Sequence, residues 1–112
     1  MTLCALGLAE ELKGDGIASN ALWPRTLVAT AAVQNLLGGD AAMARARKPE
    51  IYADAAYAIL NRPSREYTGN AALCEDVLAE EGVTDFGAYA YGDGSQLQVD
   101  LYVDQVDPPV RA

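Results

Sequence analysis

The chain has 112 residues, the length of one small domain rather than two. With 51% hydrophobic and 21% charged residues, its composition excludes a disordered or a fibrous protein. The net charge of −8 comes entirely from residues 71–112, because residues 1–70 hold equal numbers of acids and bases. This acidic segment disfavours nucleic acid and anionic membranes as partners, and we interpret it as a solvated surface.

The two cysteines, Cys4 and Cys74, are far apart and the chain has no histidine, so no metal site is predicted. Both have apolar neighbours and are expected to be reduced thiols in the core. The first residues lack the basic region of a signal peptide, and acids follow at Glu10 and Glu11. Since no apolar run is long enough to span a membrane, we predict a cytoplasmic protein.

The N-terminal half predicts a helix that ends before a glycine turn, then a strand, then two helices. Up to Ala9 the first helix has almost no polar face, which predicts burial on more than one side. Asp40 is expected to cap the third helix. The predicted ranges are helix 1–13, strand 17–23, helix 27–37 and helix 40–46.

The C-terminal half begins with a helix over residues 50–60, because Pro49 suits a first turn and an apolar stripe follows. A strand is predicted at 71–74 and a short helix at 77–81. From Thr84 the apolar residues are scattered among glycine, aspartate and proline, which predicts an extended arm outside the core. Residues 105–112 are expected to be a flexible tail.

The order strand, helices, strand predicts a βαβ unit with parallel strands and a right-handed crossover. A parallel sheet is stable when both faces are covered, and it usually has several strands. Two strands are too few, so the sequence predicts an α/β fold that is incomplete as a domain.

Five stretches of the sequence carry a family resemblance: N-A-L-W-P-R-T-L-V-A-T-A-A-V-Q-N-L-L-G-G-D, K-P-E-I-Y-A-D-A-A-Y-A-I-L-N-R-P, Y-T-G-N, V-L-A-E-E-G-V-T-D-F and D-L-Y-V-D. Together they resemble the C-terminal part of a short-chain dehydrogenase/reductase, over residues 1–104. The closest similarity is to citronellol/citronellal dehydrogenases and hydroxysteroid-dehydrogenase-like proteins. The resemblance implies the C-terminal portion of a Rossmann fold, with its last two parallel strands and flanking helices.

The resemblance further implies that the loop from Pro24 to Thr30 contacts NAD or NADP. Its backbone would meet the nicotinamide carboxamide at Leu27 or Val28. A threonine hydroxyl would meet the pyrophosphate, from Thr30 or, as a second candidate, from Thr26.

Two departures from the family pattern lie in this loop. The family has glycine where this chain has Arg25, and its threonine lies one residue closer to the proline than Thr30 does. Without the family, a helix start with free N–H groups also suits a diphosphate. The alternative is that Thr26 or Thr30 only caps the helix.

By resemblance, Leu36, Leu37 and Met43 line the substrate side, and ordinary helix packing is the alternative for all three. Asp54 is interpreted as a cap or as a hydrogen-bond partner of a neighbouring loop. The adjacent carboxylates Glu75-Asp76 and Glu80-Glu81 are not expected to act as a catalytic pair, because neighbours in sequence point apart.

No catalytic residue is predicted in the chain. It has no glycine-rich dinucleotide turn, no catalytic serine, and no tyrosine four residues before Lys13 or Lys48. We therefore expect a truncated NAD(P)-dependent short-chain oxidoreductase, inactive alone, whose full-length form binds the dinucleotide and an apolar alcohol, aldehyde or ketone. The resemblance also implies a homo-oligomer. The alternative is a non-catalytic module that binds a protein partner through its apolar helix and strand edge.

Overall fold

The computed structural model describes residues 1–36, 38–92 and 97–98. The predicted segments 99–104 and 105–112, and the candidate residue Leu37, lie outside the described residues. The elements in chain order are α1 (Thr2–Leu12), η1 (Lys13–Asp15), β1 (Ala21–Trp23), α2 (Ala31–Leu36), α3 (Gly39–Ala44), α4 (Glu50–Leu60), β2 (Ala71–Leu73), α5 (Cys74–Glu80) and η2 (Gly87–Tyr89).

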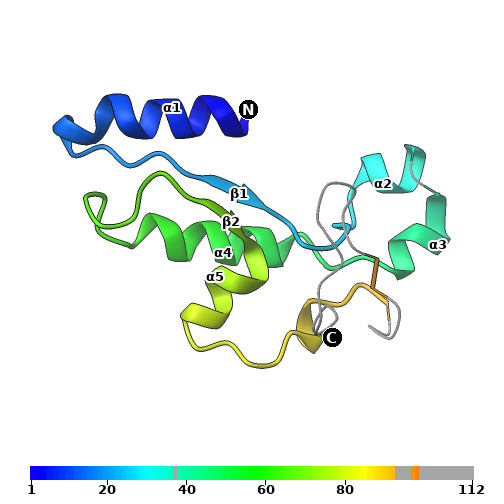
Figure 1. The fold of residues 1–112 in the computed structure, drawn as a ribbon. Helices are drawn as coiled ribbons and strands as arrows, with labels where there is room; N and C mark the ends of the chain where they lie inside the picture. Colours follow the sequence, from blue (N-terminus) through cyan, green and yellow to red (C-terminus); the bar gives the residue numbers. More distant parts are fainter. Residues whose placement is uncertain (37, 93–96, 99–112) are drawn as a thin grey trace.

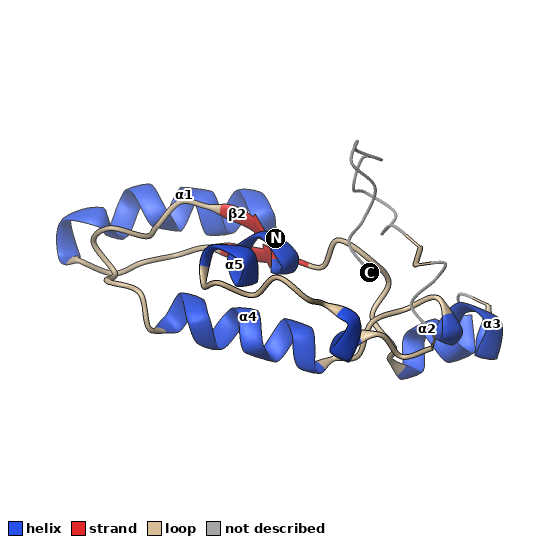
Figure 2. Ribbon diagram, turned by 90° about the horizontal axis from the view of Figure 1, so that it is seen from below, coloured by secondary structure: helices blue, strands red, loops and turns tan. Residues whose placement is uncertain are grey.

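The two strands form a parallel pair, as the sequence predicted. Ala21, Leu22 and Trp23 lie opposite Ala71, Ala72 and Leu73 in register. The strands lie between α1 on one side and α4 on the other (Figures 1 and 2). The α/β prediction of two parallel strands with flanking helices is therefore confirmed.

Two asparagines lie opposite each other just before the strands begin. The side-chain oxygen of Asn20 accepts hydrogen bonds from the backbone N–H of Asn70 at 3.1 Å and from its side-chain amide at 3.0 Å. The amide of Asn20 donates to the carbonyl of Tyr67. Because the strands are only three residues long and rich in alanine, these bonds add a polar determinant of register.

The core of the βαβ unit is an apolar cluster between α4, α5 and η2. Its buried members are Ile51, Ala55, Cys74, Val77, Leu78 and Phe86. Helix α4 has the predicted bounds, and its buried residues Ile51 and Ala55 belong to the predicted stripe. Phe86 is fully buried, so the prediction that the chain from Thr84 lies outside the core is wrong at this residue. The apolar area that the Phe86 ring buries is large enough to bring this segment into the core although its neighbours in sequence are polar.

The segment after β1 differs from the prediction, because the helix expected from Leu27 begins only at Ala31. Residues 27–29 are extended instead. The Leu27 carbonyl accepts from the N–H of Arg47 at 2.9 Å, and the Ala29 N–H donates to the Arg47 carbonyl at 2.8 Å. These long-range bonds satisfy the backbone groups that a helix would have paired locally.

Helix α3 also begins differently, since Gly38 is its N-cap residue and Asp40 lies in its first turn. The φ of Gly38 is 128°, a conformation that glycine adopts more readily than other residues. The predicted cap by Asp40 is therefore wrong, because Gly38 occupies the N-cap position and Asp40 lies inside the helix.

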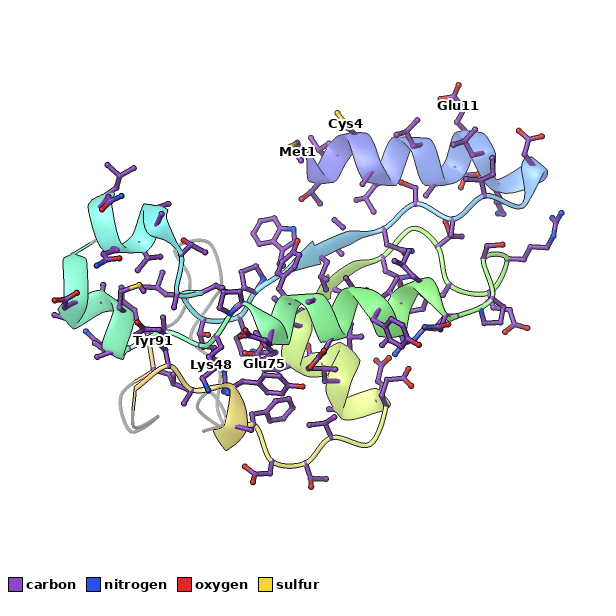
Figure 3. The ribbon with its side chains drawn as sticks, turned by 180° about the vertical axis from the view of Figure 1, so that it is seen from behind. Met1, Cys4, Glu11, Lys48, Glu75 and Tyr91 are labelled. Carbon is purple, nitrogen blue, oxygen red and sulfur yellow. The ribbon has the colours of Figure 1, made fainter. Side chains whose placement is uncertain are left out.

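Helix α1 is exposed on the side that faces away from the strands. Leu3 is 84% and Leu8 47% exposed, and only Ala9 is buried. Cys4 and Glu11 point away from the sheet (Figure 3). Cys4 is thus an exposed free thiol, contrary to the prediction of a core residue, whereas Cys74 is buried. The predicted burial of this helix on several sides does not occur within the described part of the chain.

Candidate functional site

The candidate site is the loop from Pro24 to Thr30, which leaves the carboxyl end of β1 (Figure 1). Trp23 ends the strand, and its indole N–H donates to the Thr2 hydroxyl of α1 at 3.0 Å. In open α/β sheets, ligands bind outside the carboxyl ends of the strands. Loop 24–30 therefore lies where a ligand of such a sheet is expected.

The two candidate threonines have different surroundings. Thr26 is 1% exposed, and its hydroxyl donates to the Leu27 carbonyl at 3.2 Å. Thr30 is exposed, and its hydroxyl oxygen accepts from the Val33 N–H at 3.4 Å. The capping alternative is thus observed for Thr30, at a long distance, while its exposed hydroxyl can still meet a ligand. The Thr26 hydroxyl is turned into the protein.

The peptide groups of Leu27 and Val28 point in different directions. The Leu27 N–H already donates to the Gln98 carbonyl at 2.9 Å, and the Leu27 carbonyl accepts from Arg47. Val28 bridges Arg47 in a parallel sense. Successive peptide groups of an extended segment point to opposite sides, so the N–H and carbonyl of Val28 point away from Arg47. Val28 is therefore the better placed of the two to offer backbone groups to a ligand.

The substrate-side candidates are not equivalent. Leu36 ends α2 and is 80% exposed. Met43, in α3, packs against a second apolar cluster made of Leu27, Ala29, Val33, Ala42 and Ala46. Met43 therefore has a packing role, whereas Leu36 presents a free apolar side chain next to Leu37, which lies outside the described residues.

Two ion pairs at the start of α5 were missed by the sequence analysis. Arg25 Nη2 lies 3.0 Å from Asp76 Oδ1 and 3.1 Å from Oδ2. Arg47 Nε lies 3.0 Å from Glu75 Oε1, with both side chains buried. By resemblance we expected glycine at the position of Arg25, and this departure was the available signal for the first pair. The second has no local signal, since its partners come from segments 28 residues apart in sequence.

Arg47 also contacts η2. Its Nη1 donates to the Phe86 carbonyl at 3.0 Å, and the guanidinium carbon lies 5.5 Å from the centre of the Phe86 ring. Burial lowers the pKa of Arg47 from its ordinary value, an effect that the neighbouring carboxylate of Glu75 partly offsets. Arg47 therefore joins the candidate loop, α5 and η2 at one buried point.

The other acidic residues form structural contacts. Glu75 and Asp76 bind different arginines, as expected for sequence neighbours, whereas Glu80 and Glu81 both bind Arg62, so the expectation that they point apart is wrong. Asp54 accepts a hydrogen bond from the Tyr89 hydroxyl at 2.6 Å, which confirms its predicted role. Within residues 1–36, 38–92 and 97–98, no group of His, Cys, Asp and Glu can hold a metal ion, and no helix is long and apolar enough to cross a membrane.

No protein-family model matches the chain. It is 47% identical over 105 residues to hydroxysteroid dehydrogenase-like protein 2 of Xenopus laevis and 46% identical over 105 residues to that of Homo sapiens. The alignments cover 94% of this chain and 24% of each relative, so the chain spans about a quarter of their length.

Two solved structures are also similar. A short-chain dehydrogenase from Mycobacterium thermoresistibile is 73% identical with a TM-score of 0.82, and the match covers 93% of this chain and 37% of that one. A putative dehydrogenase from Xanthomonas campestris is 45% identical with a TM-score of 0.84, covering 93% and 38%. The chain belongs to the short-chain dehydrogenase/reductase family, and it corresponds to one α/β part of the larger Rossmann-type structure of its relatives.

Proposed function

We propose that loop 24–30 forms the nicotinamide side of an NAD or NADP site in an oxidoreductase. The observation that carries this proposal is the extended conformation of residues 27–29, which leaves the peptide groups of Val28 directed away from Arg47. A carboxamide has one donor and one acceptor side, and an N–H and a carbonyl of one residue match both. The exposed Thr30 hydroxyl is a further donor for a diphosphate oxygen.

The dinucleotide, when bound, supplies the hydride transfer. The described residues would orient its nicotinamide ring through Val28, and Pro24 fixes the backbone at the start of the loop. Exposed Leu36 suits an apolar alcohol, aldehyde or ketone as substrate. The relatives' name, hydroxysteroid dehydrogenase-like, agrees with an apolar substrate class.

We further propose that these 112 residues do not catalyse hydride transfer alone, because no tyrosine lies four residues before a lysine. The exposed leucines of α1 support an assembly in which that helix is covered. The same exposed helix is the observation that favours the second candidate, a non-catalytic module that binds a protein partner.

A chimera tests the first proposal. Residues 2–98 replace the matched segment of the Mycobacterium thermoresistibile dehydrogenase, whose 73% identity should preserve the contacts around the graft. Dinucleotide binding is measured by calorimetry, and turnover by nicotinamide absorbance with a series of apolar alcohols. We expect tight binding and measurable turnover.

Variants of the chimera then test the loop. Thr30→Val removes the hydroxyl and should weaken dinucleotide binding by about tenfold, the value of one hydrogen bond to a charged group. Thr30→Ser should restore it. The matched control is Ser64→Ala, since the Ser64 hydroxyl bonds to the Gly16 carbonyl instead. A folded chimera that binds no dinucleotide, or equal effects of Thr30→Val and Ser64→Ala, would count against the proposal.

A further inference from the structure

Two adjacent carboxylates in the first turn of α5 hold two arginines of different segments. Asp76 binds Arg25, the second residue of loop 24–30, and Glu75 binds Arg47. Because Glu75 and Asp76 bind different arginines, α5 contacts two separated points of one region at once. The start of α5 is thereby connected to both ends of the candidate site.

The connection through Glu75 reaches the loop by way of the Arg47 backbone. The Arg47 N–H donates to the Leu27 carbonyl, and the Arg47 carbonyl accepts from the Ala29 N–H. The side chain of the same residue is 0% exposed and lies 3.0 Å from Glu75. Glu75 is therefore linked through a single residue to the peptide groups on either side of Val28.

A role in packing alone does not explain why Arg47 and Glu75 form a buried ion pair. An ion pair of this kind must be removed from water, and apolar residues of similar volume often stabilise a core as well or better. The buried Arg47 Nε and Nη2 and Glu75 Oε2 have no hydrogen-bond partner among the described residues, so the pair is not optimised for stability. What the pair does provide is an anchor for the Arg47 side chain at the start of α5.

The pair at the other end is accessible to solvent. The Asp76 side chain is 54% exposed and that of Arg25 14%, so the pair contributes little to global stability. It joins the residue after Pro24 to α5 and restricts the start of the loop. Arg25 is thus tethered to α5 by its side chain.

We infer that Glu75 and Asp76 are positioning residues that fix loop 24–30 from its two ends. This inference rests on the proposed function for the identity of the ligand, and it concerns the conformation of the loop itself. A correctly held Val28 lowers the ordering needed when the nicotinamide carboxamide binds. Loss of either carboxylate should therefore weaken dinucleotide binding while leaving the chemical step nearly unchanged.

Amide hydrogen exchange of the 112-residue chain, followed by NMR, tests the conformational part. Asp76→Asn should speed exchange of the Leu27 amide by about fivefold, the upper range of an exposed ion pair. Glu75→Gln should speed exchange of the Ala29 amide by more than about 100-fold. Glu80→Gln is the matched control, because Glu80 lies on the same helix and pairs with Arg62 at 3.0 Å.

The double exchange Arg25→Asp with Asp76→Arg should return the Leu27 amide to its original protection. If Glu75→Gln unfolds the chain, the Asp76 variants alone decide. Equal exchange at Leu27 in Asp76→Asn and Glu80→Gln would overturn the inference.

Kinetics of the chimera supply the second readout. Asp76→Asn should raise the dissociation constant and KM for the dinucleotide about threefold to fivefold with kcat unchanged, and the double exchange should restore both. If the unsubstituted chimera binds no dinucleotide, the proposed function fails while the exchange data still decide whether α5 holds the loop. A loss of kcat at unchanged KM would overturn the positioning role.

Discussion

The two apolar clusters of the molecule differ in the size of their buried side chains. The cluster between α4, α5 and η2 contains large side chains such as Ile51, Leu78 and Phe86. The cluster under the candidate loop, between α2 and α3, has three alanines among its five buried residues. Since hydrophobic stabilisation follows buried apolar area, the first cluster should hold the fold, and the second should open at a lower free energy. The candidate loop 24–30 therefore rests on the weaker of the two clusters.

The largest expected effect comes from Phe86→Ala. The side chain is 0% exposed and packs against the first cluster, so its loss should lower the free energy of unfolding by about 3–5 kcal/mol. Urea denaturation followed by circular dichroism measures this change. If Phe86→Ala lowered the free energy of unfolding no more than a substitution in the loop cluster does, the two clusters would not differ in stability as proposed.

Val33→Ala is that comparison. Val33 is 5% exposed in the loop cluster, and removal of two methyl groups should lower the free energy of unfolding by about 1.5–2 kcal/mol. Hydrogen exchange should increase mainly in residues 26–46, with α4 and α5 unaffected. Faster exchange spread evenly over both clusters would mean that they unfold as one unit.

Tyr89→Phe removes one hydrogen bond at the edge of the first cluster and should cost about 1 kcal/mol at neutral pH. The bond to Asp54, together with burial, raises the pKa of Tyr89 to about 12, above its ordinary value near 10. A raised pKa means that the stabilisation is complete below pH ~10 and is lost as pH rises towards 12. The stability difference between Tyr89→Phe and the original chain should vanish over that range; a constant difference would show that the hydroxyl bond does not form.

The two cysteines test the packing of the first cluster without a substitution, because Cys74 belongs to it and Cys4 lies on the exposed side of α1. Burial, with a contribution from the charge of Glu75, raises the pKa of the Cys74 thiol to about 12, and the thiolate is the reactive form. Exposed Cys4 should react with a thiol reagent within minutes, and Cys74 only after unfolding. Mass spectrometry of the modified chain measures both rates. Equal reaction rates would mean that the first cluster opens at a much lower free energy than its packing implies.

The predictable elements of the fold were those with a local signal. Helix α4 has the predicted bounds because Pro49, Glu50 and the stripe of Ile51 and Ala55 agree with one another. The parallel strands followed from the order of the elements. The stretch from Leu27 to Val33 is apolar except for Thr30, so its period does not separate helix from strand. Its conformation is set by Arg47 and Gln98, which are remote in sequence.

Family resemblance predicted the candidate site in the loop after the first strand, and the structure shows that this loop leaves the carboxyl end of β1. The internal geometry of the loop was not predictable. The choice between Leu27 and Val28 depends on which peptide group pairs with Arg47. The burial of Thr26 has no local signal in the sequence either. The carboxylates of α5 read as surface charge in the sequence, because nothing local shows that Glu75 has a buried arginine as partner.

The paired asparagines at the start of the strands have a consequence for how fast the chain folds. Asn20 and Asn70 meet across 50 residues of sequence, so their bonds form only after the crossover has closed. Closure of so long a segment is entropically slow, and strands of small side chains give a misaligned pair little penalty. The asparagines favour encounters of the two strands in the native register, because a shift of the register by one residue leaves their amide groups without partners. A polar contact that contributes little to the free energy of folding can thus decide which encounters between these strands lead to the native register.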